Sequence, residues 1–169
     1  MNSLELVDAG ADSAAPSQAA INEALVFQLD GQEYGMALQA VREIRSFEAP
    51  TRLAGAPADV LGVLDLRGEV IPLIDLRRRF GLPSVPFDAF TIVIVVSLGE
   101  RCVGVVADRV SDVVQLQPQQ VRPMPDMNGV PSRRHLIAIA ALEGRTIVLT
   151  DIVGLVADGG ADLALAAAA

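Results

Sequence analysis

Short stretches of alternating apolar and polar residues recur along the middle of the chain, separated by residues typical of tight turns. Near the start, Leu25, Phe27 and Leu29 alternate with polar positions, as expected for a half-buried strand. Asp30-Gly31 follows, and the chain then returns in a second apolar stretch. This pattern predicts a β-hairpin, because glycine accepts the positive φ that a two-residue turn requires.

The same combination of apolar runs around a glycine turn occurs three more times. The turns lie at Arg67-Gly68, Leu98-Gly99 and Glu143-Gly144. Each of them is flanked by apolar segments of strand length. Frequent short strands joined by tight turns are typical of a small all-β barrel or sandwich.

Two segments predict short helices among these strands. Asp75 is a good N-cap residue, Gly81 is a good residue for ending a helix, and Pro83 prevents continuation. Residues 151–156 begin in the same way, with Asp151.

The chain also contains an internal repeat. Residues 66–76 align without gaps on residues 142–152, and earlier positions around Gly31 and Glu43 repeat at a nearly equal spacing. The second copy is slightly longer, and we place its extra residues in the proline-rich segment 123–131. The repeat predicts two similar β sub-barrels with a groove between them.

The two ends of the chain lack these patterns. Residues 1–22 combine acids, alanines, serine and glutamine without a sustained period, which predicts a disordered N-terminal tail. Residues 159–169 begin with a glycine pair and continue as an Ala-rich stretch. Such a stretch favours helix but is too short to be stable alone, so we expect a C-terminal tail.

Composition narrows the function classes. The 169 residues are 51% hydrophobic and 20% charged, which predicts one domain or two small ones rather than a disordered chain. The net charge is −8 and every basic residue is arginine, which argues against binding to nucleic acid or to anionic lipid. The single cysteine, Cys102, forms no intrachain disulfide, and one histidine, His135, is too few for a typical zinc site.

The sequence offers no catalytic constellation, cofactor motif or metal site. Gly99 and Gly104 have the spacing of a phosphate loop, but valines follow where a lysine and a Ser or Thr are required. No Gly-x-Ser-x-Gly elbow is present. The longest strongly apolar stretch, residues 90–98, is too short for a membrane helix, and the first residues lack the basic start of a signal peptide. We therefore expect a soluble cytoplasmic protein that does not insert into the membrane.

Several charged residues have two interpretations, as ordinary surface residues or as functional ones. Arg67 lies at the tip of an apolar hairpin, where it is either an exposed turn residue or an interface hot spot. Glu43 lies on an alternating strand on the same face as Val41, where a carboxylate more often keeps a sheet edge soluble. For residues 77–79, three consecutive arginines, we favour a solvated helix end over a protein-binding face.

The longest motif resembles a known family. Residues 62–77 read Gly-Val-Leu-Asp-Leu-Arg-Gly-Glu-Val-Ile-Pro-Leu-Ile-Asp-Leu-Arg, which is similar to the central motif of CheW-type chemotaxis coupling proteins. Shorter matches occur in the same order over residues 25–29, 33–35, 41–45, 104–108 and 110–113. The resemblance covers residues 22–158. It departs at Asp65, where the family usually has asparagine, and this adds a negative charge on the face of Arg67.

The resemblance implies an all-β fold with a few short helices. Its expected architecture is two similar five-stranded SH3-like β-barrels packed together. We expect the first sub-barrel at about residues 22–85 and the second at about residues 86–158, with strands free to exchange between them.

The resemblance also implies a non-enzymatic adaptor without cofactors. Proteins of this family bridge the cytoplasmic tips of methyl-accepting chemoreceptors and the regulatory domain of the CheA histidine kinase. They associate in rings within receptor arrays, which implies a cytoplasmic location peripheral to the inner membrane. The family carries its signal through a change in kinase activity.

Roles of individual residues follow from the same resemblance. Val41 and Glu43 match positions associated with kinase binding. A second set matches positions associated with receptor binding or coupling: Gly62, Arg67, Thr91, Gly104 and Val113. The two glycines have an alternative role, because both can be required by backbone geometry alone.

Three other interpretations stay open at this point. A coupling protein of a parallel chemosensory system would have the same sequence features. A ligand-binding or enzymatic β-barrel would need convergent polar groups in a pocket. A nucleic-acid-binding barrel is disfavoured by the net charge and by an aromatic content of 4%.

Overall fold

The computed structural model describes residues 21–125 and 135–159. The expected tails lie outside these residues except for Ile21, Asn22 and Gly159, and so do residues 126–131 of the proline-rich segment. Ile21 is buried in a hydrophobic cluster, so the folded part begins before the end of the tail expected at residue 22. The described elements are β1 (Glu23–Leu29), β2 (Gln32–Ala37), η2 (Leu38–Ala40), β3 (Val41–Ser46), β4 (Val60–Leu66), β5 (Glu69–Asp75), α2 (Leu76–Arg79), β6 (Ile92–Leu98), β7 (Arg101–Ala107), β8 (Arg109–Gln115), η3 (Pro118–Gln120), β9 (Val121–Pro123), β10 (Leu136–Leu142), β11 (Arg145–Thr150) and α3 (Ile152–Gly159).

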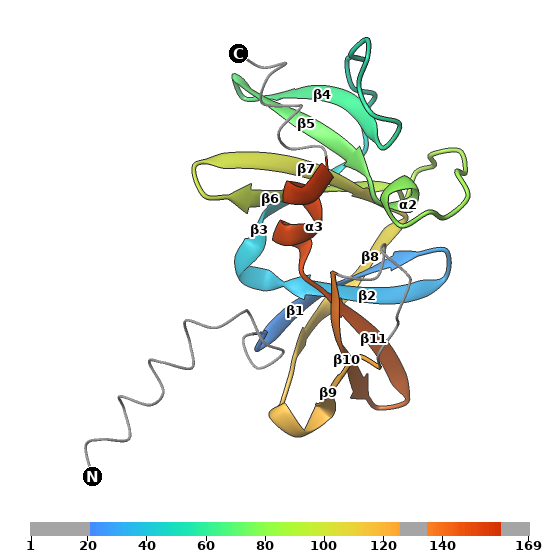
Figure 1. Ribbon diagram of the computed structural model, residues 1–169, viewed down its shortest axis with the longest axis vertical. Coiled ribbons are helices and arrows are strands. Elements are labelled where there is room, and N and C mark those ends of the chain that lie inside the picture. The colour runs from blue at the N-terminus through green and yellow to red at the C-terminus, as the bar shows by residue number, and fades with distance from the viewer. Residues whose placement is uncertain (1–20, 126–134, 160–169) are drawn as a thin grey trace, which may run out of the picture.

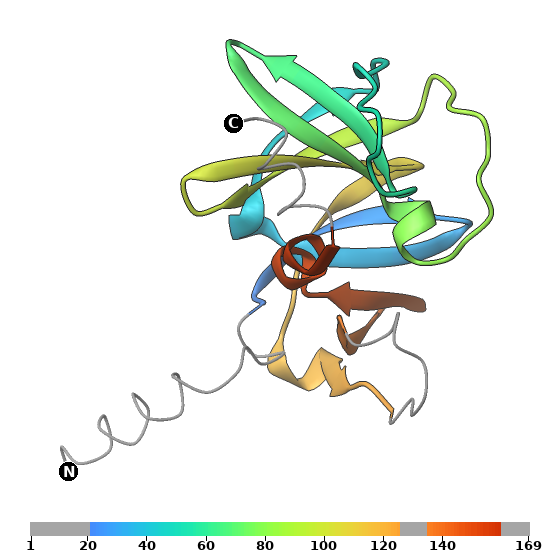
Figure 2. The ribbon, with the colours of Figure 1, turned by 45° about the horizontal axis from the view of Figure 1, so that its top comes forward.

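The described strands form two small sheets, and short helices lie at their ends. One sheet has the order β3-β6-β7-β5-β4, and the other has the order β8-β1-β2-β11-β10-β9. Figures 1 and 2 show the two sheets as separate layers with α3 between them. This architecture confirms the predicted all-β class with two similar sub-barrels. The three-residue strand β9 makes one sheet six-stranded, which the repeat did not indicate.

Each sheet draws its strands from both halves of the chain. The hairpin β1-β2 comes from the first half of the chain and pairs with β8 and β11 of the second half. The hairpin β6-β7 comes from the second half of the chain and pairs with β3 and β5 of the first half. The hairpins are thus exchanged reciprocally, and in each sheet one parallel pair, β2 with β11 or β5 with β7, joins a hairpin from one half to a strand from the other.

The two sheets repeat each other down to single registers. Gly104 of β7 lies opposite Leu73 of β5, and Gly35 of β2 lies opposite Leu149 of β11. An added Cβ would meet the facing leucine at 2.7 Å in the first pair and at 3.0 Å in the second. A register shift also occurs at corresponding points of β4 and β10. The repeat seen in the sequence is therefore a structural pseudo-symmetry.

Buried side chains form three clusters rather than one. Alternate residues of β1 point to opposite sides: Leu25, Phe27 and Leu29 face the other sheet, while Ala24 and Val26 face the interior of their own. Strand β6 divides its side chains in the same way between the shared cluster and its own interior. The shared cluster also includes buried residues of α3. This apolar layer fills much of the space where the repeat predicted a groove.

The predictions for the two helices and for three of the four turns agree with the structure. The turn expected at Leu98-Gly99 lies one residue later, because Leu98 ends β6 and pairs with Arg101. Asp30, Arg67 and Glu143 have positive φ and each precedes a glycine of positive φ, the combination expected in tight hairpins. Asp75 caps α2 by accepting a hydrogen bond from the amide of Arg77 at 3.0 Å. The second expected helix is α3, which begins immediately after Asp151.

Candidate functional site

Glu43 and Arg67, which the sequence analysis assigned to different partners, form an ion pair. Glu43 lies in the middle of β3, at one edge of the five-stranded sheet, and Arg67 lies at the tip of the β4-β5 hairpin at the other edge. A backbone bridge between Thr51 and Val63 also joins the segment after β3 to β4. The two edges therefore meet, and the ion pair lies where the sheet closes on itself.

The hairpin tip holds Arg67 in a defined but solvated position. Arg67 has a φ of +52° and Gly68 a φ of +90°, so the side chain projects from a tight turn. Asp65 Oδ1 accepts a hydrogen bond from the amide of Gly68 at 2.9 Å. Asparagine also has an Oδ1 acceptor, so the departure at Asp65 preserves this turn contact. Asp65 thus stabilises the turn, and the ion pair of Arg67 is made with Glu43.

Glu43 is surrounded by two guanidinium groups. Arg45 lies on the same half-buried face of β3, and its Nη1 is 3.5 Å from Glu43 Oε2. The hydrogen bond from Arg67 holds the pKa of Glu43 below its usual value, and the carboxylate raises the pKa of Arg67 in turn. The exposed fraction of the side chain is 28% for Glu43 and 70% for Arg67. A partner approaching this edge would meet the arginine first.

The alternation predicted that Val41 shares the face of Glu43, and this is wrong. Val41 lies opposite Val96 of the shared cluster, whereas Glu43 lies opposite Val95 of the sheet's own interior, so Val41 and Glu43 face opposite sides. Both are half-buried, whereas Arg42, Ile44 and Ser46 of the same strand are exposed. Val41 packs against the shared apolar cluster, and a register shift separates it from Glu43. The exposed aliphatic side chain of this strand is Ile44, which lies opposite Ile94 and so on the face away from Glu43.

Thr91 is buried at the start of β6 and makes local contacts. Its hydroxyl accepts a hydrogen bond from the amide of Asp88 at 2.9 Å, and its own amide donates to the backbone carbonyl and to Oδ1 of Asp88, both at 3.2 Å. Its carbonyl accepts a hydrogen bond from the amide of Phe47, just after β3. The geometry makes Thr91 a residue that fixes the loop before β6.

Gly62 and Gly104 are both buried, and the structure gives each a reason to be glycine. Gly62 has a φ of +146°, and an added Cβ would lie 2.1 Å from the carbonyl oxygen of Thr51. At Gly104 an added Cβ would meet Leu73 and Val93 side chains at 2.7 Å and 2.9 Å. Neither position offers a side chain to a partner, so backbone geometry explains both glycines.

Val113 does not lie on the sheet that carries Glu43 and Arg67. It belongs to β8, an edge strand of the six-stranded sheet. It lies opposite Leu25 of β1, and 49% of its side chain is exposed. By the repeat, Val113 corresponds to Ile44, the exposed aliphatic residue of β3. The structure thus brings Glu43 and Arg67 together, directs Val41 to the opposite face, toward the shared cluster, and keeps Val113 on the other sheet.

The six-stranded sheet closes through a related set of charges. Arg145, next to the β10-β11 turn, binds Glu33 of β2 through Nε at 3.0 Å and Asp112 of β8 through Nη2 at 2.9 Å. These two carboxylates raise the pKa of Arg145 above its usual value. Asp112 occupies the place in β8 that Glu43 occupies in β3. Each sheet therefore joins its edge strand to a hairpin tip through an acid and an arginine.

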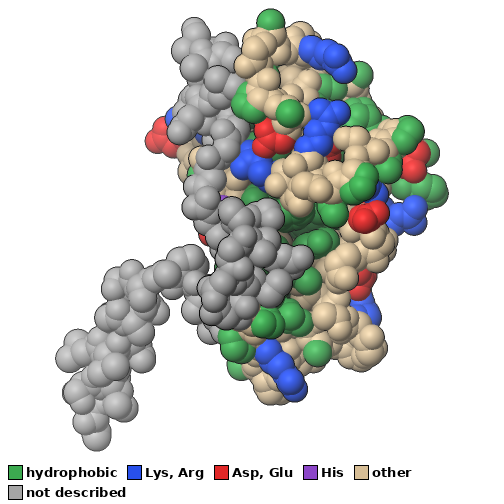
Figure 3. Space-filling model, turned by 45° about the vertical axis from the view of Figure 1, so that its right-hand side comes forward, with side chains coloured by type: hydrophobic (Ala, Val, Ile, Leu, Met, Phe, Trp, Pro, Cys, Tyr) green, Lys and Arg blue, Asp and Glu red, His purple; other side chains and the backbone are tan. Residues whose placement is uncertain are grey.

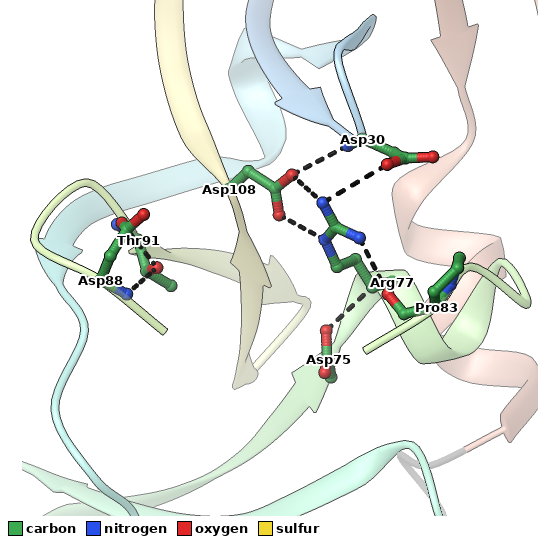
Figure 4. Close-up of polar contacts among 7 residues, drawn as sticks. All are labelled: Asp30, Asp75, Arg77, Pro83, Asp88, Thr91 and Asp108. Carbon is green, nitrogen blue, oxygen red and sulfur yellow. Dashed lines mark hydrogen bonds and ion pairs between the residues drawn. The ribbon is translucent and has the colours of Figure 1, made fainter. Parts of the chain in front are cut away.

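The preferred interpretation of residues 77–79 as a solvated helix end is wrong. The side chain of Arg77 is only 11% exposed, and its Nε and Nη2 donate to the two carboxylate oxygens of Asp108 at 2.8 Å and 2.7 Å (Figure 4). Arg79 is also largely buried, pairs with Asp59 and donates to the carbonyl of Leu155 in α3. Arg78 is more exposed. No local pattern signals these contacts, because Asp108 is distant in sequence.

Burial and pairing shift the pKa values of the carboxyl groups near Arg77 in opposite directions. Burial tends to raise the pKa of Asp108, but the hydrogen bonds from Arg77 and from the amide of Asp30 outweigh it, so the pKa lies below its usual value. Burial raises the pKa of Asp75 despite its contacts with the Arg77 and Arg78 amides and charges. Asp108 therefore acts as a stable anion, whereas the charge of Asp75 is costly.

A pocket of about 300 Å³ opens beside Arg77 and Asp108. Its other lining residues include Gln28 of β1, Thr91 before β6 and Arg109 of β8, so both sheets contribute to it. The guanidinium of Arg109 lies 4.6 Å from the ring centre of Phe90, which is 60% exposed.

The surface combines charged and apolar side chains. Arginine and acidic side chains lie interspersed with exposed apolar ones over the face drawn in Figure 3. Within residues 21–125 and 135–159, no group of three His, Cys, Asp or Glu side chains is placed to hold a metal ion. None of the described helices is long and apolar enough to cross a membrane.

Comparison with known proteins gives one consistent result. The family model of the CheW-like domain matches residues 23–159. Chemotaxis protein CheW of Klebsiella aerogenes is 42% identical over 130 residues, which cover 77% of this chain and 78% of the relative. Chemotaxis protein CheW of Rhizobium meliloti is 35% identical over 130 residues, with 77% and 84% covered.

The fold also matches a solved structure. The crystal structure of the scaffolding protein TtCheW from Thermoanaerobacter tengcongensis superposes with a TM-score of 0.73. The match covers 80% of this chain and 92% of that structure, at 24% sequence identity. At this identity the likeness establishes the fold.

Proposed function

The chain belongs to the CheW-like domain family, and we propose on that premise that it is a non-enzymatic chemotaxis scaffold that couples chemoreceptors to a CheA-type histidine kinase. The observation that carries the proposal is the extent of the family match, which spans residues 23–159 and therefore both sheets. The relatives named above are chemotaxis proteins, and the match covers most of their length. We take residues 22–158 as the unit that binds the partners.

The proposed site has a kinase-binding part and a receptor-binding part that touch each other. Val41 and Glu43 form the first part, and Arg67 and Val113 are the exposed side chains of the second. Gly62, Thr91 and Gly104 support the second part by fixing the backbone around it. Because Glu43 binds Arg67, occupation of one part changes the environment of the other. The coupling needs no chemical reaction on this chain.

The surroundings of the site fit this role. The surface offers exposed arginine, a residue enriched in interfaces between folded proteins, together with exposed aliphatic side chains. Contacts of this kind are individually modest and gain strength when they are repeated in an array. We include self-association in rings within such arrays, in the cytoplasm at the inner membrane, in the proposal.

Binding to each partner separately tests the proposed site. We expect Glu43→Ala to weaken binding of the kinase regulatory domain and Arg67→Ala to weaken binding of a soluble receptor tip, measured by titration calorimetry. Because the two side chains form one ion pair, we also expect the loss of binding free energy in the double variant to differ from the sum of the losses in the two single variants. Arg122→Ala, which removes an exposed arginine from β9, is the matched control.

Two results would count against the proposal. The first is unchanged dissociation constants for both partners in folded Glu43→Ala and Arg67→Ala proteins. The second is a comparable loss in Arg122→Ala, which would show that the effect follows from net charge rather than from the site.

A further inference from the structure

Arg77 connects the two sheets through a set of contacts that we call the Arg77 cluster: Asp30, Arg77, Pro83 and Asp108 (Figure 4). Arg77 belongs to α2, which directly follows β5 of the five-stranded sheet. Its guanidinium binds both oxygens of Asp108, and its Nη1 donates to the carbonyl of Pro83 at 2.8 Å. The cluster thus begins on the five-stranded sheet and on the loop that leads to β6.

The carboxylate that receives Arg77 is held by the other sheet. Asp108 lies where the chain passes from β7 in one sheet to β8 in the other. Its amide donates to the carbonyl of Gln28 in β1 at 3.0 Å, and its Oδ2 accepts from the amide of Asp30 in the β1-β2 turn at 2.8 Å. Asp30 Oδ1 is also 3.7 Å from Arg77 Nη2. The guanidinium therefore bridges backbone and side-chain groups of both sheets.

The apolar layer between the sheets does not by itself fix their relative orientation. Leu25 and Phe27 of one sheet pack against Ile94 and Val105 of the other within the shared cluster. Burial of such side chains is strongly stabilising, but its free energy follows the apolar area removed from water rather than one direction. A two-point fork between a guanidinium and a carboxylate adds the missing direction, because it requires one distance and one plane. A buried polar pair at the edge of an apolar interface is suited to this task.

The repeat shows that the cluster occurs on one side of the molecule only. At the position of α3 that corresponds to Arg77 the chain has Val153, which is 40% exposed. At the position that corresponds to Asp108 it has Gln39, an exposed residue of η2. The crossing from β7 to β8 therefore carries the guanidinium–carboxylate fork, whereas α3 packs its apolar side on the shared cluster and is joined to α2 by a hydrogen bond, from Arg79 to the carbonyl of Leu155.

We propose that Arg77 is a positioning residue that sets the orientation of the two sheets, and with it the spacing between Arg67 on one sheet and Val113 on the other. The functional part of this inference rests on the proposed scaffold role, in which a partner in contact with both sheets requires that spacing. The structural part stands without it. Arg77 itself touches no partner in this account.

Distance measurements between spin labels test the inference without any partner. One label pair, at Ser46→Cys and Gln115→Cys, spans the two sheets, and a second pair, at Ser46→Cys and Glu100→Cys, lies within the five-stranded sheet; all three positions are exposed. The buried Cys102 is replaced by serine in every protein. Arg77→Gln and Asp108→Asn break the fork from either side. Arg78→Gln is the control, because Arg78 is more exposed and its contacts are with Ala58, Ser84 and Asp75 of the five-stranded side.

We expect Arg77→Gln and Asp108→Asn to broaden or shift the distance between the sheets by more than the width measured for the parent. The distance within the sheet should be unchanged, and Arg78→Gln should match the parent on both distances. An unchanged distance between the sheets in either fork variant would overturn the proposal. Loss of both distances would overturn it as well, since it would show that Arg77 maintains the whole fold rather than the orientation.

The partner assays separate this inference from the proposed function. If the spin-label result is as expected and Arg77→Gln weakens simultaneous binding of receptor and kinase more than it weakens either alone, both stand. If the distances change but no receptor or kinase binds even to the parent protein, the proposed function fails and the positioning role of Arg77 stands.

Discussion

Single residues in this protein divide into those that present a side chain and those that shape the backbone beneath it. Arg67 and Glu43 present charge at the closure of the five-stranded sheet. Gly62 and Gly104 lie in the same sheet but present nothing, because an added Cβ would meet neighbouring atoms. The sequence left both roles open for the two glycines, and the structure supplies the backbone reason.

The glycines give a graded prediction for stability. Gly62→Ala combines positive φ with a collision against backbone and should lower the free energy of unfolding by about 3 kcal/mol or more. Gly31→Ala has positive φ but open space around it, and should cost about 1 kcal/mol. Gly104→Ala should lie between them, since it meets side chains that can shift. Urea unfolding measures the series, and equal losses at Gly62 and Gly31 would refute the collision.

The two aspartates near Arg77 predict opposite pH dependence. The pKa of Asp108 is lower when folded than when unfolded, so its contribution is present above about pH 4 and is lost as the pH falls through the folded pKa. The pKa of Asp75 is raised by burial, so its ionisation lowers stability as the pH rises through that raised value.

Asparagine variants measure both contributions. Asp108→Asn should cost about 2 kcal/mol at pH 7, with a smaller difference from the parent in strong acid. Asp75→Asn should become more stable relative to the parent as the pH rises from about 4 to 7, because the amide removes a buried charge and keeps the cap. Urea unfolding of the parent and of both variants, from acid pH to pH 7, measures these differences in the free energy of unfolding. A parallel response of the two variants would disprove the assigned shifts.

At the scale of elements, the features that the sequence predicted correctly are those that depend on residues close together in the chain. The hairpin turns at Asp30, Arg67 and Glu143, the cap at Asp75 and the start of α3 all follow from residues close in sequence. The reciprocal exchange of hairpins could not be derived in this way. Because the two halves of the chain are similar, the local sequence of a hairpin does not show whether it pairs with strands of its own half or of the other half. Packing across the whole chain decides this.

The Arg77 cluster was invisible to the sequence for a related reason. A run of three arginines near a helix end ordinarily remains in solvent. Here Arg77 is buried because Asp108 and the carbonyl of Pro83 come from other elements and satisfy its donors. The expectation therefore failed at a tertiary contact, while the helix that carries the arginine was correctly predicted.

At the scale of the whole molecule, the shared apolar layer makes one body of two similar sheets. Together with the orienting role proposed for Arg77, this layer would hold Arg67 on one sheet and Val113 on the other at a defined spacing. A scaffold needs this property, because two partners are coupled only when their binding sites have a defined relation. The family match over both sheets and the ion pair between the two proposed contact regions support that role.

The most direct test of this role is the autophosphorylation rate of a CheA-type kinase reconstituted with receptor cytoplasmic fragments, with and without the protein. The account predicts that the rate rises only when all three components are present. It also predicts that Glu43→Ala and Arg67→Ala reduce the rise while Arg122→Ala does not. A rate that is indifferent to the folded parent protein, in a reconstitution that responds to another CheW protein, would contradict the account.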